Sequence, residues 1–364
     1  MRISEIETPA IVIDLDIMER NLARVAEYAR ANDLKLRPHT KTHKIPALAR
    51  KQMDLGAVGI TVAKVGEAEV MLAANPAELY VAYPVIGHRK LERLMEVARQ
   101  TKLMVGLDSE FAARQLSDAA RQAQVEVGVL AEVDVGLNRV GVNPGEQLIA
   151  LGKAIQNQPR LRLEGITFYP GHIKAADESA EPAIEALSAL VHRLTAEWKR
   201  EGLPCSIVSG GSTPLLFQSH RIAGMTEIRP GTYIFNDKNT WFMGACKQED
   251  CAATILTTVV STARPGQIII DGGSKTFSSD RLANSSEVSF GYFVDAPEAV
   301  LGKMNEEHGF VDVRNTGRDF SVGDRLRVIP NHICVAVNLH EQIYGVRGDV
   351  VESVWPVAAR GKLQ

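Results

Sequence analysis

Two lysines and two histidines are clustered in the segment Arg37-Pro38-His39-Thr40-Lys41-Thr42-His43-Lys44, directly after the short apolar alternation of residues 34–36. The alternation predicts a buried strand, so the cluster should lie where that strand ends. A lysine amine there can form a Schiff base if burial or neighbouring cations lower its pKa from about 10.4 towards neutrality. Spacing alone leaves Lys41 and Lys44 as competitors, with Lys35 as a third candidate. A basic loop without chemistry is the alternative interpretation.

A second segment, Ser209-Gly210-Gly211-Ser212-Thr213, has the composition of a phosphate-binding turn. Small residues let backbone N–H groups approach an anion, and the hydroxyl groups add further donors. A flexible turn can have the same composition. Whether this segment is a phosphate-binding turn or only a flexible turn therefore depends on its position in the fold.

The third feature is the pair His332 and Cys334, which one residue separates. In an extended segment the two side chains fall on the same side, about 6–7 Å apart along the backbone, so both could bind one ion. Imidazole and thiolate ligands favour Zn²⁺, and two protein ligands leave positions open for water and substrate. A buried cysteine beside a structural histidine is the alternative. Nothing near Cys246 and Cys251 completes a metal site, so we interpret them as structural.

Strands and helices alternate between about residues 10 and 235, which predicts parallel βαβ units. About eight such units suggest a closed, TIM-type (β/α)8 barrel rather than an open sheet. The expected strands are 10–16, 34–39, 59–63, 79–84, 102–108, 125–134, 163–169 and 206–209. The clearest expected helices are 17–30, 90–100, 109–122 and 181–200.

The candidate residues follow these strands. Lys41 lies just past the second strand, Arg139 follows the sixth, Tyr169 ends the seventh, and the segment 209–213 follows the eighth. Active sites of (β/α)8 barrels gather at the carboxyl ends of the strands. A barrel therefore brings these four groups to one face.

The pattern changes near Thr226. From about residue 252, the expected strands 252–262, 267–271, 309–313 and 325–329 are linked by Gly, Asp and Asn turns, without long helices. This pattern predicts a mostly antiparallel β domain.

Bulk properties limit the class of protein. The 364 residues are enough for about two domains, and 45% hydrophobic with 23% charged residues is ordinary for a globular chain. A formal net charge of −3 gives no basic field for a nucleic-acid partner. The sequence contains no apolar run of membrane-spanning length, and its N-terminus lacks the apolar core of a signal peptide. With four irregularly spaced cysteines, these features predict a cytoplasmic enzyme with no membrane partner.

Three segments together resemble one enzyme family. They are residues 7–10 (Glu-Thr-Pro-Ala), residues 37–41 (Arg-Pro-His-Thr-Lys) and residues 59–69 (Gly-Ile-Thr-Val-Ala-Lys-Val-Gly-Glu-Ala-Glu). They are similar to the D-threonine aldolase and D-serine dehydratase-like group, whose members carry pyridoxal phosphate (PLP) on an alanine-racemase-type barrel. The resemblance implies a PLP-binding barrel at 10–235. It also implies a β domain, built from 1–9 and 236–364, that carries the metal site, and a homodimer.

The resemblance also assigns roles near the cofactor. It chooses Lys41 as the Schiff-base lysine, flanked by His39 and His43. It implies that Arg139, within the run Val133–Gly141, reaches the cofactor, where an arginine would keep the pyridine nitrogen neutral. It makes residues 209–213 the phosphate cradle, and it matches Gly231-Thr232-Tyr233, after Arg229-Pro230, to a second phosphate-contacting turn.

Further roles follow from the same resemblance. Tyr169 and His172 lie at the mouth of the seventh strand, and with Lys41 and His39 they are the expected catalytic residues. Some relatives carry a histidine directly after this tyrosine, where Pro170 stands here. In the family, His-x-Cys or His-x-Asp holds a divalent metal beside the cofactor, which assigns His332 and Cys334. The expected ion is Zn²⁺ or Mn²⁺, with Mg²⁺ as a further candidate.

The implied substrate is a D-3-hydroxy amino acid, because a metal near its 3-hydroxyl can promote retro-aldol cleavage or loss of water. Cys334 resembles the dehydratase branch. Residues 41–46, 59–69 and 81–87 resemble low-specificity D-threonine aldolases, and this longer similarity favours an aldolase. The alternative is a D-serine, D-threonine or 3-hydroxy-D-aspartate dehydratase. A racemase is less favoured: it would need a second acid/base such as Tyr292 or Tyr344, and it would leave the metal pair without a purpose.

Overall fold

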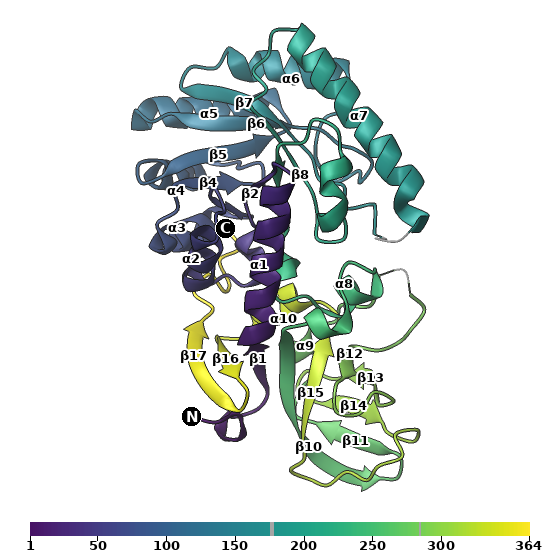
Figure 1. Cartoon of the computed structure of the whole chain (residues 1–364). Helices are drawn as coiled ribbons and strands as arrows, with labels where there is room; N and C mark the ends of the chain where they lie inside the picture. The colour runs from purple at the N-terminus through teal and green to yellow at the C-terminus, as the bar shows by residue number, and fades with distance from the viewer. Residues whose placement is uncertain (175–177, 284) are drawn as a thin grey trace. The chain divides into compact units, whose positions relative to one another are not determined.

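The computed structural model describes residues 1–174, 178–283 and 285–364 (Figure 1). The chain forms two compact units. The barrel domain comprises Arg24–Lys41, Ile45–Gly231 and Gly361–Gln364, and the β domain comprises Met1–Ala23, Thr42–Lys44 and Thr232–Arg360. Within these described ranges, no helix is both long and apolar enough to cross a membrane.

The barrel domain is built on a parallel sheet that has eight strands in the described part of the chain. A helical segment follows each of the first seven strands, so the chain returns to start each new strand in the same direction. The strands are β2 (Lys35–Leu36), β3 (Ile60–Val62), β4 (Glu78–Val81), β5 (Lys102–Leu107), β6 (Val127–Glu132), β7 (Leu161–Thr167), β8 (Ile207–Gly210) and β9 (Glu227–Ile228). The α-helices are α2 (Pro46–Asp54), α3 (Val65–Met71), α4 (His88–Ala98), α5 (Glu110–Ala123), α6 (Glu146–Gln156) and α7 (Glu181–Arg200).

The sheet closes on itself between β2 and β3. His39, just beyond β2, forms a parallel bridge with Thr61 in β3. The backbone N–H of Thr61 donates to the carbonyl of Pro38, and that of Val58 to the carbonyl of Leu36, both at 2.9 Å. These contacts join the two ends of the strand order, so the expected (β/α)8 barrel is confirmed.

Burial explains why these segments became strands and helices. All six residues of β6 are buried, because a strand in a closed parallel barrel is covered on both faces. In α5, Ala112, Leu116 and Ala120 form a buried stripe at four-residue spacing. Ser109 caps the start of α5 by accepting a hydrogen bond from the Ala112 N–H.

One barrel strand was assigned wrongly from the sequence. Residues 10–14 do form a strand, β1 (Ala10–Asp14), but β1 pairs with strands of the β domain. The eighth barrel strand is β9, which pairs with β2 and β8 and was not expected. Lys41 therefore follows the first barrel strand rather than the second, and the other candidates shift by one strand in the same way. The remaining expected strands lie within a few residues of those observed.

The β domain contains a sheet with nine strands among the described residues, in the order β13-β14-β11-β10-β1-β16-β17, with β15 pairing β10 and β12. The expected mostly antiparallel sheet is confirmed, since β1 and β16 are the only strands of this sheet that pair in parallel in the described part of the chain. Besides β1, its strands are β10 (Ala253–Arg264), β11 (Gln267–Ile270), β12 (Gly291–Phe293), β13 (Val300–Met304), β14 (Gly309–Asp312), β15 (Arg325–Pro330), β16 (Gln342–Arg347) and β17 (Val350–Pro356). Its helices are α8 (Lys238–Phe242), α9 (Ser274–Phe277) and α10 (Ile333–Leu339), and α1 (Leu15–Ala31) links β1 to the barrel domain along the chain.

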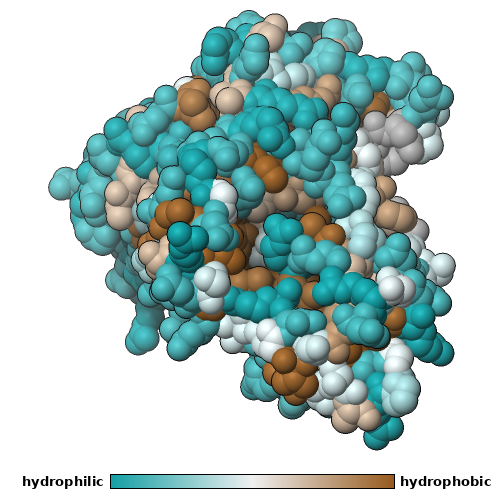
Figure 2. Space-filling view, turned by 60° about the horizontal axis from the view of Figure 1, so that its bottom comes forward, coloured by the Kyte–Doolittle hydropathy of each residue, from teal (hydrophilic) through white to brown (hydrophobic). Residues whose placement is uncertain are grey.

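An apolar cluster holds the first strand in the β domain. Ala10 and Val12 of β1 pack with Leu256 of β10 and Val346 of β16, and Ile6 completes the cluster. Burying these side chains stabilises the placement of β1, although its partners lie more than two hundred residues away. On the outside, the face drawn in Figure 2 is mostly hydrophilic, with apolar residues in separate areas.

Candidate active site

Lys41 lies in a short 3-10 helix (Thr40–Thr42) just beyond the carboxyl end of β2. Its side chain is exposed. The backbone N–H of Lys41 donates to Nδ1 of His39 at 3.3 Å, so the half-buried His39 shapes the turn that carries the lysine. An exposed amine at the carboxyl end of a barrel strand is well placed to react with a carbonyl compound.

Lys44 has a different environment. It is 6% exposed, and its Nζ donates to Oδ1 of Asn338 in α10 at 2.8 Å. Its backbone adopts a left-handed conformation with φ of 57°. The buried, bound amine of Lys44 supports Lys41 as the cofactor lysine, a choice that spacing alone left open.

A network of buried charges lies inside the barrel. Arg37, 1% exposed, donates to Glu227 at 2.9 Å and to Glu78 at 2.7 Å. The Ser209 hydroxyl donates to the other oxygen of Glu227 at 2.7 Å and accepts a hydrogen bond from Arg229. The desolvation cost of burying these charges is offset by their pairing and by the additional hydrogen bonds. The Ser209 hydroxyl is therefore held by Glu227 and Arg229 inside the barrel, and its expected contact with a phosphate stays a prediction.

The rest of the glycine-rich segment forms a tight turn. Gly210 ends β8, and a Cβ on it would lie 2.5 Å from the ring of Phe168. Gly211 has φ of +88°, a conformation that favours glycine. Ser212 and Thr213 follow, both buried. A positive-φ turn with small residues turns successive backbone N–H groups towards an anion.

The second expected phosphate turn begins just after β9. Gly231 ends the barrel-domain range Ile45–Gly231, and the buried Thr232 and Tyr233 start a 3-10 helix (Thr232–Ile234). Gly231 is buried too. Small residues at the end of the last barrel strand are typical of phosphate sites in this fold.

The loops after β6 and β7 come together. The guanidinium carbon of Arg139 lies 4.9 Å from the centre of the Tyr169 ring, a cation–π geometry. The exposed His172 packs over Gly136, where an added Cβ would lie 3.2 Å from the imidazole. Asp134 orders the β6 loop by accepting hydrogen bonds from three successive backbone N–H groups. Three expected site residues, Arg139, Tyr169 and His172, therefore belong to one rim.

Two further charged residues were missed from the sequence. Arg229, directly after β9, is buried; it donates to the carbonyl of Phe168 at 3.1 Å and lies 5.3 Å from the Tyr80 ring centre. Glu132 ends β6, and burial raises its pKa, although the charge of Arg229 opposes the shift. The Arg-Pro-Gly sequence could have drawn attention to Arg229. Nothing in the sequence distinguishes Glu132.

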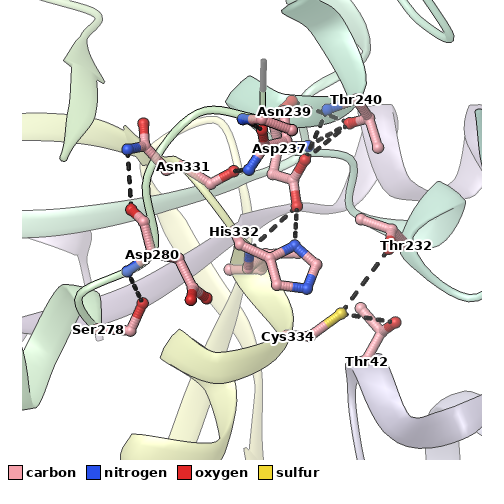
Figure 3. A network of polar contacts seen from close by, with 12 residues as sticks. Thr42, Thr232, Asp237, Asn239, Thr240, Ser278, Asp280, Asn331, His332 and Cys334 are labelled. Carbon is pink, nitrogen blue, oxygen red and sulfur yellow. Dashed lines mark hydrogen bonds and ion pairs between the residues drawn. The ribbon is translucent and has the colours of Figure 1, made fainter. Parts of the chain in front are cut away.

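The metal pair does not lie in an extended segment, so that expectation was wrong. His332 is the N-cap of α10, and Cys334 is the second residue of this helix. The two side chains still face one another. In Figure 3, one ring nitrogen of His332 points to Asp237, and the other ring nitrogen lies on the side of the Cys334 sulfur. Cys334 Sγ also lies 3.2 Å from Thr42 Oγ1 and 3.7 Å from Thr232 Oγ1.

Asp237 holds His332 from the opposite side and was not expected. It is 0% exposed, and its Oδ2 lies 2.9 Å from Nδ1 of His332 (Figure 3). The Cys334 thiolate charge raises the pKa of His332 to about 12, with the Asp237 hydrogen bond adding to it and burial opposing it. The only sequence signal for Asp237 is an Asp-x-x-Thr pattern typical of a helix start.

These residues fit both expected groups. An imidazole and a thiolate in contact form a donor pair suited to Zn²⁺. Among residues 1–174, 178–283 and 285–364, no three His, Cys, Asp or Glu side chains gather as a metal site. An ion here would therefore keep positions open, as catalytic ions do. The exposed Lys41 amine and the glycine turn after β8 fit PLP.

Comparison with known proteins identifies the family of this chain. A family model described as alanine racemase, N-terminal domain, matches residues 13–239, and one described as a serine dehydratase domain matches residues 252–346. A D-threonine aldolase of Arthrobacter sp. is 33% identical over 99% of this chain and 94% of its own length. A D-threo-3-hydroxyaspartate dehydratase of Delftia sp. is 34% identical over 90% of this chain and 91% of its own.

A solved structure extends the similarity to the whole fold. The crystal structure of D-threonine aldolase from Filomicrobium marinum matches with a TM-score of 0.92 and 32% identity, covering 100% of this chain and 98% of that one. Two findings therefore show the family: the Arthrobacter aldolase is more than 30% identical over nearly the full length, and the alanine racemase N-terminal model matches residues 13–239. The chain therefore belongs to the D-threonine aldolase and D-serine dehydratase-like family, PLP-dependent lyases with an alanine-racemase-type barrel.

Proposed function

We propose that this enzyme uses PLP and a divalent metal to cleave D-3-hydroxy amino acids to glycine and an aldehyde, as a D-threonine aldolase does. The observation that carries the proposal is the 3.2 Å contact between Cys334 Sγ and Thr42 Oγ1. Thr42 directly follows Lys41 in the chain. The candidate metal ligand thus touches the neighbour of the candidate cofactor lysine. The similarity to the Arthrobacter aldolase, over 99% of this chain, supports the aldolase reaction.

The two candidate sites have separate tasks. PLP bound at Lys41 would supply an electron sink for the substrate's α-carbon. An ion held by His332 and Cys334, either Zn²⁺ or Mn²⁺ with Mg²⁺ as a third choice, would act as a Lewis acid on the 3-hydroxyl. The turn Gly211–Thr213 and the turn Gly231–Tyr233 would bind the cofactor phosphate through backbone N–H groups.

Cleavage between Cα and Cβ needs a group that takes the hydroxyl proton and one that returns a proton to Cα. We assign these tasks to Lys41, His39, Tyr169 and His172, which belong to loops at the carboxyl ends of β2 and β7. Removal of the hydroxyl proton lets the oxygen form the aldehyde C=O bond while the Cα–Cβ bond breaks and its electron pair stays on Cα. The aldehyde then leaves, and protonation of Cα gives glycine.

Two arginines compete for a place beside the cofactor's pyridine nitrogen. Arg139 is exposed and lies over Tyr169, whereas Arg229 is buried at the end of β9. A guanidinium cannot accept the proton of that nitrogen, so either arginine would keep it neutral. Replacing each with lysine and recording the visible absorbance of the bound cofactor distinguishes them, because only the true neighbour should change the spectrum.

Dehydration of the same substrates is the second candidate function. The thiolate ligand Cys334 and the 34% identity to the Delftia dehydratase favour it. In that reaction the metal would assist departure of the hydroxyl group instead of loss of its proton.

Incubation with D-threonine separates the two reactions. Glycine and acetaldehyde mean the aldolase reaction, and 2-oxobutanoate with ammonia means the dehydratase reaction. We expect glycine and acetaldehyde in equal amounts. Formation of L-allo-threonine, the product of inversion at Cα alone, would contradict both reactions and favour racemisation.

We also propose that the enzyme is a homodimer with the β domain of each subunit near the partner's active site. The family resemblance supports this arrangement. The turn-rich segments 271–275 and 290–292 are the expected contact regions. A fully active monomer in sedimentation experiments at micromolar concentration would contradict it.

A further inference from the structure

We propose that Asp237 is a positioning residue that holds His332 in the tautomer whose Nε2 can bind a metal ion. The inference deepens the proposed metal-dependent function and rests on it. Asp237 itself does not contact the ion in this proposal. It acts only through the imidazole of His332 and the start of helix α10.

Both oxygens of the Asp237 carboxylate are occupied by hydrogen-bond donors. Oδ2 lies 2.9 Å from Nδ1 of His332 and accepts from the backbone N–H of Ile333 at 3.1 Å. Oδ1 accepts from the backbone N–H of Thr240 at 2.8 Å and from the Thr240 hydroxyl at 3.0 Å. The side chain has no exposed surface, so water does not compete for these contacts. Figure 3 shows the carboxylate between the start of α8 and the His332 ring.

The direction of these bonds fixes the protonation of the imidazole. A backbone N–H can only donate. The N–H of Ile333 donates to Oδ2 of Asp237, and the N–H of Thr240 donates to Oδ1. The buried carboxylate is therefore an acceptor on both sides. The nitrogen that faces it, Nδ1 of His332, must carry a proton. In a neutral imidazole the lone pair is then on Nε2, the nitrogen turned towards Cys334.

An asparagine cannot reproduce this arrangement in either orientation. If its NH₂ group faces His332, Nδ1 becomes the acceptor and Nε2 carries the proton that blocks a metal. If its oxygen faces His332, the NH₂ group opposes the Thr240 N–H. In both orientations the negative charge that makes the imidazole a stronger ligand is lost.

The test is a metal titration of PLP-loaded, metal-stripped protein. We expect Asp237→Asn to bind Zn²⁺ about 10- to 100-fold more weakly than wild type. The visible absorbance of the lysine-bound cofactor should be unchanged, because Asp237 acts on the metal site alone. Cofactor absorbance and metal affinity are measured on the same samples.

Thr240→Val is the matched control for a purely structural role. It removes the hydroxyl at the Oδ1 side and weakens the helix start, but leaves the His332 contact in place. We expect its Zn²⁺ affinity to stay within about threefold of wild type. Equal losses in Thr240→Val and Asp237→Asn would overturn the inference, and so would wild-type affinity in Asp237→Asn.

A measurement on wild type covers the case in which Asp237→Asn does not fold. ¹⁵N spectra of histidine-labelled, Zn²⁺-bound protein report which nitrogen of His332 holds the metal. The proposal requires Zn²⁺ on Nε2 and a proton on Nδ1, and the reverse assignment overturns it. If wild type binds no Zn²⁺ or Mn²⁺ at all, the metal-dependent function fails together with the inference, whereas tight wild-type binding with no loss in Asp237→Asn removes the inference alone.

Discussion

Alanine substitution of Lys41 and of Lys44 should give opposite effects on stability and on cofactor binding. Lys41 is exposed, so Lys41→Ala should change the free energy of unfolding of the cofactor-free protein by less than about 0.5 kcal/mol. The same change should abolish the visible absorbance of the lysine-bound cofactor. Lys44→Ala should retain that absorbance.

The cost of Lys44→Ala follows from its buried contact. Removing the amine breaks a charged hydrogen bond to Asn338 Oδ1, which corresponds to about 1.5–3 kcal/mol. Lys44→Gly removes the same hydrogen bond, but glycine adopts the left-handed conformation at φ of 57° without the strain that a Cβ causes. Lys44→Gly should therefore be about 1 kcal/mol more stable than Lys44→Ala. That difference isolates the backbone effect from the hydrogen bond.

The assay combines urea unfolding of the cofactor-free proteins with absorbance after addition of PLP. Borohydride reduction followed by peptide mapping identifies the lysine that carries the cofactor. Trapping on Lys44, or loss of absorbance in Lys44→Ala with retention in Lys41→Ala, would refute the assignment of the two lysines.

Three further substitutions test the barrel domain. Ser209→Ala removes buried bonds to Glu227 and Arg229 and should lower the free energy of unfolding by about 1–3 kcal/mol in urea titrations, with cofactor absorbance retained; loss of cofactor binding without loss of stability would instead place the hydroxyl on the phosphate. Burial of Glu78 acts to raise its pKa, but hydrogen bonds from Lys102 and Arg37 outweigh burial and lower the pKa below the ordinary value of 4.5. The ionised Glu78 therefore stabilises the folded protein at neutral pH, and this stabilisation is lost as the pH falls below 4.5 and through the lowered pKa. Glu78→Gln should therefore be less stable than wild type by about 1 kcal/mol at pH 7, and the two unfolding curves should converge in acid; a constant difference across pH would contradict this. Gly152→Ala places a methyl group 2.5 Å from the Trp198 ring. Overpacking costs about 1–3 kcal/mol and the higher helix propensity of alanine returns up to about 1 kcal/mol, so we expect a net loss of about 1–2 kcal/mol in the same urea assay. Unchanged stability would mean that the residues around Trp198 can move to make room.

The sequence predicted the barrel well because the alternation of strands and helices is a local pattern. The rule that active sites gather at the carboxyl ends of barrel strands then placed Lys41, Arg139 and Tyr169 at one end without a structure. What failed was the assignment of one strand to the barrel. β1 has the composition of a barrel strand but pairs with β10 and β16, which the local sequence does not encode.

Short elements set the other limit. β9 has two residues, too few for a periodic pattern, and its strand bonds to β2 and β8 were found only in the structure. The sequence of α10, Ile-Cys-Val-Ala-Val-Asn-Leu, contains three β-branched residues, which are more common in strands than in helices. The helix forms where Asp237 accepts the N–H of Ile333, one of the unpaired donors at a helix start.

The candidate site was predictable where residues cluster in sequence and hidden where they meet only in space. His332 and Cys334 are neighbours in the chain, so their pairing was visible. Asp237 lies 95 residues from His332, and its role depends on a contact between α8 and the start of α10. Spacing alone left Lys41 and Lys44 open as the cofactor lysine; the burial of Lys44 and its bond to Asn338 favour Lys41, which stays a prediction.

The central claim is that a metal held by His332 and Cys334 takes part in the chemistry of a PLP lyase. The most direct measurement is the rate of D-threonine consumption by PLP-loaded protein before and after removal of metal with a chelator, with cofactor absorbance recorded throughout. We predict that turnover stops in the stripped enzyme while the absorbance persists, and that added Zn²⁺ or Mn²⁺ restores the rate. Full turnover in the metal-stripped protein would contradict the account.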